Sequence, residues 1–203
     1  MLFSHYRRSQ MKRFFQLAAA LLAVSSLALS QSGWKLDKNH SSIGFSVKHL
    51  VISTVSGNFK DFDITLTTAK DDFSDAAVQA VIKMASINTD NTARDNHLKS
   101  DDFFNAEKFP EIKFTSTSFE KVGEGKYKIT GDLTIRDVTK KVVFDAVYNG
   151  SIKTPWGNTA MSWTAATVIN RFDYNLKWNK ALESGGLIAG QDVTITINLE
   201  MDK

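Results

Sequence analysis

The stretch KYKITGDLTIR, residues 126–136, decides the fold class, because apolar and polar side chains alternate along it without a break. One face carries every second residue, namely Tyr127, Ile129, Gly131, Leu133 and Ile135. A period of two is typical of a β-strand with one buried face and one solvent face. The stretch is therefore predicted to be a half-buried strand of an antiparallel sheet.

The same alternation recurs on both sides of this strand. It is found in the segments 42–49, 62–66, 78–84, 142–148, 163–169 and 193–200, and it begins again at Ile112 and Phe114. Hairpin turns are predicted at 123–125 and 154–158, and a bulge is predicted at Asn149-Gly150. About eight antiparallel strands without long helices form either a sandwich or a closed barrel. Strand patterning does not choose between these two folds.

The stretch from Ile87 to Phe114, INTDNTARDNHLKSDDFFNAEKFPEIKF, lacks this alternation. Asn91 or Thr92 can cap a short helix, and Pro110 favours an end to the irregular region. A short helical lid over about residues 91–105 is predicted at one end of the β-structure. We expect any specific chemistry of the protein to lie where this lid meets the strands.

The first thirty residues have the features of a secretory signal peptide. Four cations and no acidic residue (Arg7, Arg8, Lys12 and Arg13) precede an apolar run from Phe14 to Leu29, and small residues precede Gln31. The run is shorter than the roughly 20 residues of a membrane-spanning helix. Residues 1–30 are therefore predicted to be cleaved near Ser30/Gln31. The remaining domain, residues 31–203, is predicted to be periplasmic or secreted, with no stable membrane span.

Loss of this leader changes the charge of the protein. The full chain carries +3, and removal of four cations leaves +3 − 4 = −1. A chain without a basic excess is not expected to bind nucleic acid. The sequence contains no cysteine, so an exported domain of this kind must depend on a hydrophobic core rather than on disulfides.

Several motifs in this order resemble the YceI-like family. They are Trp34-Lys-Leu-Asp37, the segment His40–His49, Gly57-Asn-Phe59, Ile87-Asn-Thr89, the segment Arg94–Phe104, Phe109-Pro110, Ile112-Lys-Phe114, Gly131–Ile135 and Ile169-Asn170-Arg171. The resemblance covers the chain from about Trp34 to its carboxyl end. It implies an eight-stranded antiparallel, lipocalin-like barrel that is exported and binds a polyisoprenoid or a similar long-chain amphiphile. Asp137 and the sequence Asp173-Tyr174-Asn175 depart from the family pattern, and we expect only the shapes of their loops to differ.

Two groups of residues are candidates for such a ligand. The headgroup candidates at the barrel mouth are Arg94, Asp95, His97, His40 and Arg171; the alternative is that these residues only brace the lid and the strand ends. The apolar candidates are Phe45, Phe62, Ile64, Ile82, Phe103, Phe104, Phe114, Ile129, Leu133, Phe144 and Trp163. The same apolar residues could instead pack into a solid core, because an eight-stranded barrel can be filled or hollow.

Other kinds of site are not expected. His40 and His49 lack metal-ligand spacing, no Gly-x-Ser-x-Gly elbow accompanies Ser41, and no glycine-rich phosphate loop precedes a helix. We therefore expect no metal, no cofactor other than a bound isoprenoid or fatty-acid-like molecule, and no catalysis. The alternatives are a lipid-modifying enzyme centred on Arg94, Asp95 and His97, or a filled barrel with a stress or structural role. Whether the chain forms a homodimer is left open.

Overall fold

The computed structural model describes residues 32–179 and 187–203. In chain order the elements are β1 (Ser32–Leu36), β2 (Ser42–His49), β3 (Ser53–Phe59), β4 (Phe62–Thr68), β5 (Ala77–Lys83), η1 (Met84–Ser86), β6 (Ile87–Asn88), α2 (Thr92–Lys99), β7 (Glu111–Gly123), β8 (Lys126–Ile135), β9 (Val138–Lys153), β10 (Thr159–Asn170), η2 (Arg171–Tyr174) and β11 (Ala189–Asp202). The predicted signal peptide lies outside the described residues. Within them, neither the α-helix nor the short 3₁₀ turns have the length and apolar character needed to cross a bilayer.

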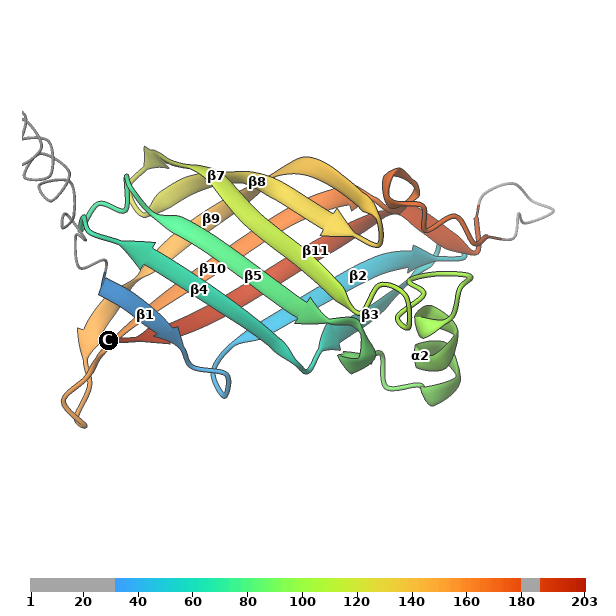
Figure 1. Cartoon of the computed structure of the whole chain (residues 1–203), viewed down its shortest axis with the longest axis horizontal. Coiled ribbons are helices and arrows are strands. Elements are labelled where there is room, and N and C mark those ends of the chain that lie inside the picture. The colour runs from blue at the N-terminus through green and yellow to red at the C-terminus, as the bar shows by residue number, and fades with distance from the viewer. Residues whose placement is uncertain (1–31, 180–186) are drawn as a thin grey trace, which may run out of the picture. The chain divides into compact units, whose positions relative to one another are not determined.

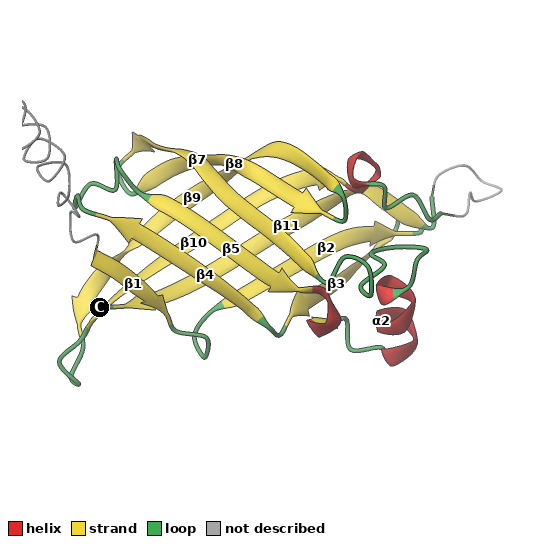
Figure 2. Ribbon diagram, in the orientation of Figure 1, coloured by secondary structure: helices red, strands yellow, loops and turns green. Residues whose placement is uncertain are grey.

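The strands form one antiparallel sheet that closes on itself, as Figures 1 and 2 show. Sequential neighbours pair from β7 to β11, and β1 closes the ring by pairing with β11 on one side and β4 on the other. Each of the pairs β1/β2, β3/β4 and β5/β6 consists of two consecutive segments that share one position in the ring. Both β1 and β2 pair with β11, and they pair with β4 and β3 on their other side. In the same way, β4 pairs with β5 and β3 pairs with β6. These three positions together with β7–β11 make eight. The predicted eight-stranded barrel is confirmed, and the sandwich alternative is wrong.

Two of these three interruptions, those between β3 and β4 and between β5 and β6, lie side by side. The amide of Lys60 donates to the carbonyl of Ser86 (3.1 Å), and the amide of Lys83 donates to the carbonyl of Asp61 (3.0 Å). The break between β3 and β4 is therefore hydrogen-bonded to η1, the break between β5 and β6. The backbone groups at these two interruptions therefore stay paired although the strands are broken there.

The strand positions agree with the predicted alternation. Along β8, the residues from Tyr127 to Ile135 on the predicted face are buried. Position 131 on this face is a glycine because the ring of Phe114 on β7 lies over it. A Cβ at this position would come within 2.4 Å of the ring. Strand β9 runs through Asn149-Gly150, and its register with β10 shifts there, which confirms the predicted bulge.

The turn between β2 and β3 has an unfavourable backbone for its sequence. Leu50 and Val51 have φ values of 52° and 67°, which lie in the left-handed region. The loop has three residues, because His49 at the end of β2 pairs with Ser53 at the start of β3. Glycine and asparagine adopt the left-handed region readily, whereas a leucine, and even more a β-branched valine, is strained there. Strain of this kind costs on the order of 1–3 kcal/mol for each residue.

The two ends of the barrel carry different connecting segments. Strands β4/β5, β7/β8 and β9/β10 are joined at one end, and β2/β3, β8/β9 and the segment after η2 meet at the other, where α2 also lies (Figure 1). We call these the closed end and the lid end. Helix α2 begins after Asn91, whose side-chain oxygen accepts a hydrogen bond from the amide of Arg94 (2.9 Å). The predicted cap and the predicted lid helix are thus present.

Candidate functional site

The barrel interior contains two apolar cavities with a common wall. The inner cavity encloses about 110 Å³ within the strands. The outer cavity encloses about 270 Å³ between the strand ends and the segment that carries α2. The wall residues that they share are Phe45, Phe59, Ile112, Ile135 and Ile195. A flexible apolar molecule could therefore extend from the lid end into the barrel if these side chains move apart.

Aromatic rings fill the closed end of the barrel. Phe73, from the loop after β4, lies edge-on to Trp163 with ring centroids 4.9 Å apart. Tyr148 packs on Trp163 at 4.9 Å, and Tyr127 lies 5.1 Å from it. Phe119 completes the group at 5.6 Å from Trp163. Because Trp163 and Phe119 also line the inner cavity, this aromatic cluster forms its floor.

Most of the predicted apolar residues lie against these cavities. Those that line the inner cavity are Phe45, Ile64, Ile82, Phe114, Ile129, Leu133, Phe144 and Trp163. Phe103 and Phe104 line the outer cavity, together with Phe45. Phe62 differs: it is buried in the core and lines neither cavity. That these side chains contact a ligand stays a prediction.

Sequence reasoning missed Phe59 and Trp178. Phe59 lines both cavities, and its place in the Gly57-Asn-Phe59 motif was a usable signal. Trp178 lines the outer cavity from the irregular segment after η2, where no periodicity indicates which side chains point inward.

Two of the predicted headgroup residues fix the lid to the sheet. Asp95 is buried, and its Oδ1 accepts hydrogen bonds from the amide (2.9 Å) and the hydroxyl (2.6 Å) of Thr89. Arg94 donates from Nε to the hydroxyl of Thr89 and from Nη2 to its carbonyl, both at 2.8 Å. Thr89 follows β6, so these bonds tie the first turn of α2 to the end of a strand. Arg94 also lines the outer cavity.

Arg171 holds the other wall of the lid end. Its buried guanidinium donates to the carbonyls of Gly190 (2.8 Å), Ala189 (3.0 Å) and Trp178 (2.9 Å), and also to that of Leu176. One guanidinium thereby donates hydrogen bonds to carbonyls on both sides of the segment that connects η2 to β11. This arrangement explains why a charge is buried beside an apolar cavity.

His97 presents a polar ring beside the outer cavity. The ring stands edge-on to Phe103 and to Trp178, with centroids 5.1 and 5.0 Å away. Its Nε2 lies 3.0 Å from a carboxylate oxygen of Asp102. Three predicted headgroup residues, Arg94, His97 and Arg171, thus combine polar atoms with a place in the wall of the outer cavity, and the Arg171 guanidinium is already bonded to backbone carbonyls.

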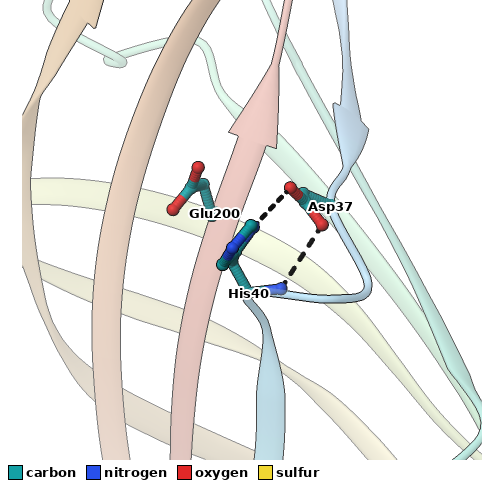
Figure 3. Close-up of side chains that lie close together, drawn as sticks. All are labelled: Asp37, His40 and Glu200. Carbon is teal, nitrogen blue, oxygen red and sulfur yellow. Dashed lines mark hydrogen bonds and ion pairs between the residues drawn. The ribbon is translucent and has the colours of Figure 1, made fainter.

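His40 lies elsewhere, in the turn between β1 and β2, and it lines neither cavity. Figure 3 shows it between Asp37 and Glu200. Its Nδ1 is 2.7 Å from Asp37 Oδ2, while Asp37 Oδ1 accepts from the amides of Asn39 and His40. The hydrogen bond with Asp37 raises the pKa of His40, and the same bond lowers the pKa of Asp37. The three side chains lie within 4.8 Å of one another, but the Asp37 carboxylate serves here as the cap of the turn.

The chain belongs to the YceI-like family. The model of the YceI-like domain matches residues 34–201, which is nearly the whole described region. A UPF0312 protein of Staphylococcus aureus strain MSSA476 is 41% identical over 170 residues, covering 83% of this chain and 96% of the relative. The family suggested by the sequence motifs is therefore confirmed.

Solved structures share the barrel. The Campylobacter jejuni YCEI protein is 35% identical, with a TM-score of 0.64 over 83% of this chain and 96% of that protein. A Saccharophagus degradans domain, described as polyisoprenoid-binding and implicated in plant cell wall breakdown, has a TM-score of 0.60 at 15% identity, covering 85% of this chain and 99% of the domain. At that identity the second likeness bears on the fold alone.

Proposed function

We propose that the protein is a non-catalytic carrier of a long-chain amphiphile of the polyisoprenoid type, with the tail in the barrel and the head beneath α2. The observation that carries the proposal is the pair of apolar cavities with a shared wall. The outer cavity alone is larger than the roughly 150 Å³ apolar cavity that is known to bind benzene. The proposal takes its ligand class from the description of the Saccharophagus degradans domain, which shares the fold, as polyisoprenoid-binding.

The tail supplies the affinity in this proposal. Transfer of each methylene from water to an apolar site contributes about 0.8 kcal/mol, part of which is offset by the ordering of the tail. The aromatic cluster at the closed end limits how far the tail can reach, because Trp163 forms the cavity floor. Tails longer than the two cavities must fold back or extend past the lid.

The head is placed by His97 and Arg94. The His97 ring packs edge-on against Phe103 and Trp178, whose rings also contact each other at 5.2 Å. Arg94 reaches the cavity from a helix that is fixed on Thr89. Since Arg94 and Asp95 are both bonded to Thr89, we assign them a positioning role rather than a catalytic one. A charged head would gain more from Arg94 than a neutral quinone would.

Export to the periplasm or the outside of the cell belongs to the same proposal. It is supported by the basic and apolar pattern of residues 1–30. The carrier would then move or store its ligand outside the cytoplasm.

The test uses prenyl alcohols of increasing chain length and the tryptophan fluorescence of the full chain, because Trp163 and Trp178 line the cavities. Saturable binding at one ligand per chain is expected. Ala165→Leu places a larger side chain in the inner cavity and should weaken binding of the longer alcohols about tenfold while sparing the shortest. Ala166→Leu is the matched control, since the next residue on β10 is exposed.

Two results would overturn the proposal. One is the absence of binding for every chain length. The other is an equal effect of the Ala165 and Ala166 substitutions, which would place the ligand outside the barrel.

A further inference from the structure

The hairpin between β2 and β3 exposes consecutive aliphatic side chains at the lid end. Leu50 is 36% exposed, Val51 64% and Ile52 86%. A soluble surface tolerates single apolar residues, but three in sequence at the tip of a hairpin form a protruding apolar point.

The backbone of this turn is unfavourable for these residues. Leu50 and Val51 are both in the left-handed region, where Asn-Gly would be relaxed. Neither side chain belongs to the hydrophobic core or packs against it, and Val51 is mostly exposed, so burial in the core does not compensate for the strain. The aliphatic side chains themselves are therefore the feature that needs an explanation.

The tip stands at the rim of the outer cavity. Residues on the two strands that lead to it, Val47, His49 and Val55, line that cavity. The amide of Leu50 donates to the carbonyl of Ile188 (2.9 Å), and Ile188 lines the same cavity. Whatever surface contacts the tip therefore lies beside the opening through which a ligand would pass.

The charge of the hairpin suits a lipid headgroup region. From Ser42 to Phe59 the sequence contains no acidic residue, and its one cation, Lys48, is exposed two residues before Leu50. Such a hairpin can approach zwitterionic or anionic headgroups without like-charge repulsion.

We propose that the Leu50–Ile52 tip inserts into a lipid bilayer and docks the lid end of the barrel on the membrane surface. Three side chains are too few for a protein interface, which needs roughly 800 Å² from each partner, but a few aliphatic groups at a tip are enough for shallow, reversible insertion. The inference goes beyond the carrier function, because it states where the carrier exchanges its ligand.

The first experiment measures flotation of the full chain with vesicles of phosphatidylcholine, with and without roughly 30% phosphatidylglycerol. The double substitution Leu50→Asn with Val51→Gly should reduce vesicle binding about tenfold or more. Because Asn and Gly both tolerate the positive φ values of positions 50 and 51, the same variant should unfold at an equal or higher temperature than the unsubstituted protein. Trp156→Ser is the control, since Trp156 is 88% exposed in the β9–β10 turn at the closed end, and its removal should leave binding unchanged.

The second experiment reports which end touches the membrane. The chain has no cysteine, so Ile52→Cys and Trp156→Cys each provide one site for an environment-sensitive fluorophore. Addition of vesicles should shift the emission of the Ile52 probe to shorter wavelength and leave that of the Trp156 probe unchanged.

Three results would overturn the docking proposal: no flotation with either vesicle composition, equal flotation of the Asn-Gly variant, or self-association in solution that the Asn-Gly substitution abolishes. The vesicles contain no isoprenoid, whereas the prenyl alcohol titration contains no vesicles. Failure of docking can therefore be distinguished from failure of the carrier function.

Discussion

The closed end and the lid end of the barrel are made from the same strands and contain similar numbers of aromatic rings, yet one is filled and the other is hollow. At the closed end, Phe73 reaches in from a loop and its ring packs against Trp163 at 4.9 Å. At the lid end, Phe103 and Phe104 come from the segment after α2 and line a cavity of about 270 Å³. The segments that connect the strands, rather than the strands themselves, thus decide where space remains.

We expect the residues at the two ends to contribute differently to the stability of the fold and to ligand binding. Rings that pack on one another at the closed end contribute mainly to the free energy of unfolding, because their removal leaves a void. Side chains around the outer cavity already face empty space, so their removal should change stability less and ligand binding more. The predictions below test this division.

The largest effect is expected at the closed end. Trp163→Ala removes the ring shared by Phe73, Tyr127 and Tyr148 and should lower the free energy of unfolding by about 3–5 kcal/mol. Phe104→Ala at the lid end should cost about 1–2 kcal/mol. Urea denaturation of both variants provides the comparison, and equal losses would mean that the two ends do not differ in packing.

Arg171→Met should produce the next largest effect. It removes the guanidinium donor from the carbonyls of Trp178, Ala189 and Gly190, of which Ala189 still accepts from the Asn179 amide, so we expect a loss of about 3 kcal/mol in unfolding free energy. Arg171→Lys should recover only part of it, because an ammonium cannot reproduce the guanidinium fork. Full recovery by lysine would show that the charge alone matters.

A smaller effect is expected where the lid is fixed. Asp95→Ala leaves the amide and hydroxyl of Thr89 without an acceptor and should cost about 1–3 kcal/mol, whereas Asp95→Asn keeps an oxygen at the same position and should cost less. Amide hydrogen exchange should then increase in α2 and leave β8 and β9 unchanged. Faster exchange throughout the barrel would contradict a local role for the Thr89 contacts.

The smallest effect concerns pH and the exposed pair of Asp37 and His40. The raised pKa of His40 means that its contribution is complete below the ordinary histidine value of 6.5 and is lost as pH rises through the higher folded-state pKa. The lowered pKa of Asp37 means that its contribution is present above 3.8 and is lost as pH falls through the lower folded-state pKa. The pair is therefore strongest between these two ordinary values.

NMR titration of the His40 ring measures this directly. Its midpoint should lie above 6.5 and should fall in Asp37→Asn, since the hydrogen bond that His40 Nδ1 donates to the Asp37 carboxylate is the main cause of the raised pKa. An unchanged midpoint in the variant would show that Asp37 is not the cause. We expect no change in ligand binding, because His40 lines neither cavity.

Much of the fold could be predicted from the sequence, because the alternation along strands such as β8 records directly which face is buried. The lid helix was also predictable, since Asn91 is a strong cap and the pattern changes at that point. Closure of the sheet was not, because it depends on the pairing of Lys35 and Leu36 with residues at the far end of the chain. Family motifs, and not periodicity, supported the barrel.

The candidate site was predictable only in part. Inward-facing residues of the strands follow from the alternation, so most of the predicted lining lies against the cavities. Alternation does not distinguish a ring that packs on other rings from one that faces empty space, and Trp163 does both. The roles of Arg171 and Asp95 depend on carbonyls and amides of irregular segments, whose positions local sequence does not reveal.

Co-crystallisation of the protein with a prenyl alcohol such as farnesol would show whether the two cavities hold one continuous ligand. We expect continuous ligand density from the neighbourhood of His97 and Trp178, past Phe45, to the ring of Trp163. Density confined to the outer surface, with Phe45 and Phe59 still closing the interior, would contradict this expectation.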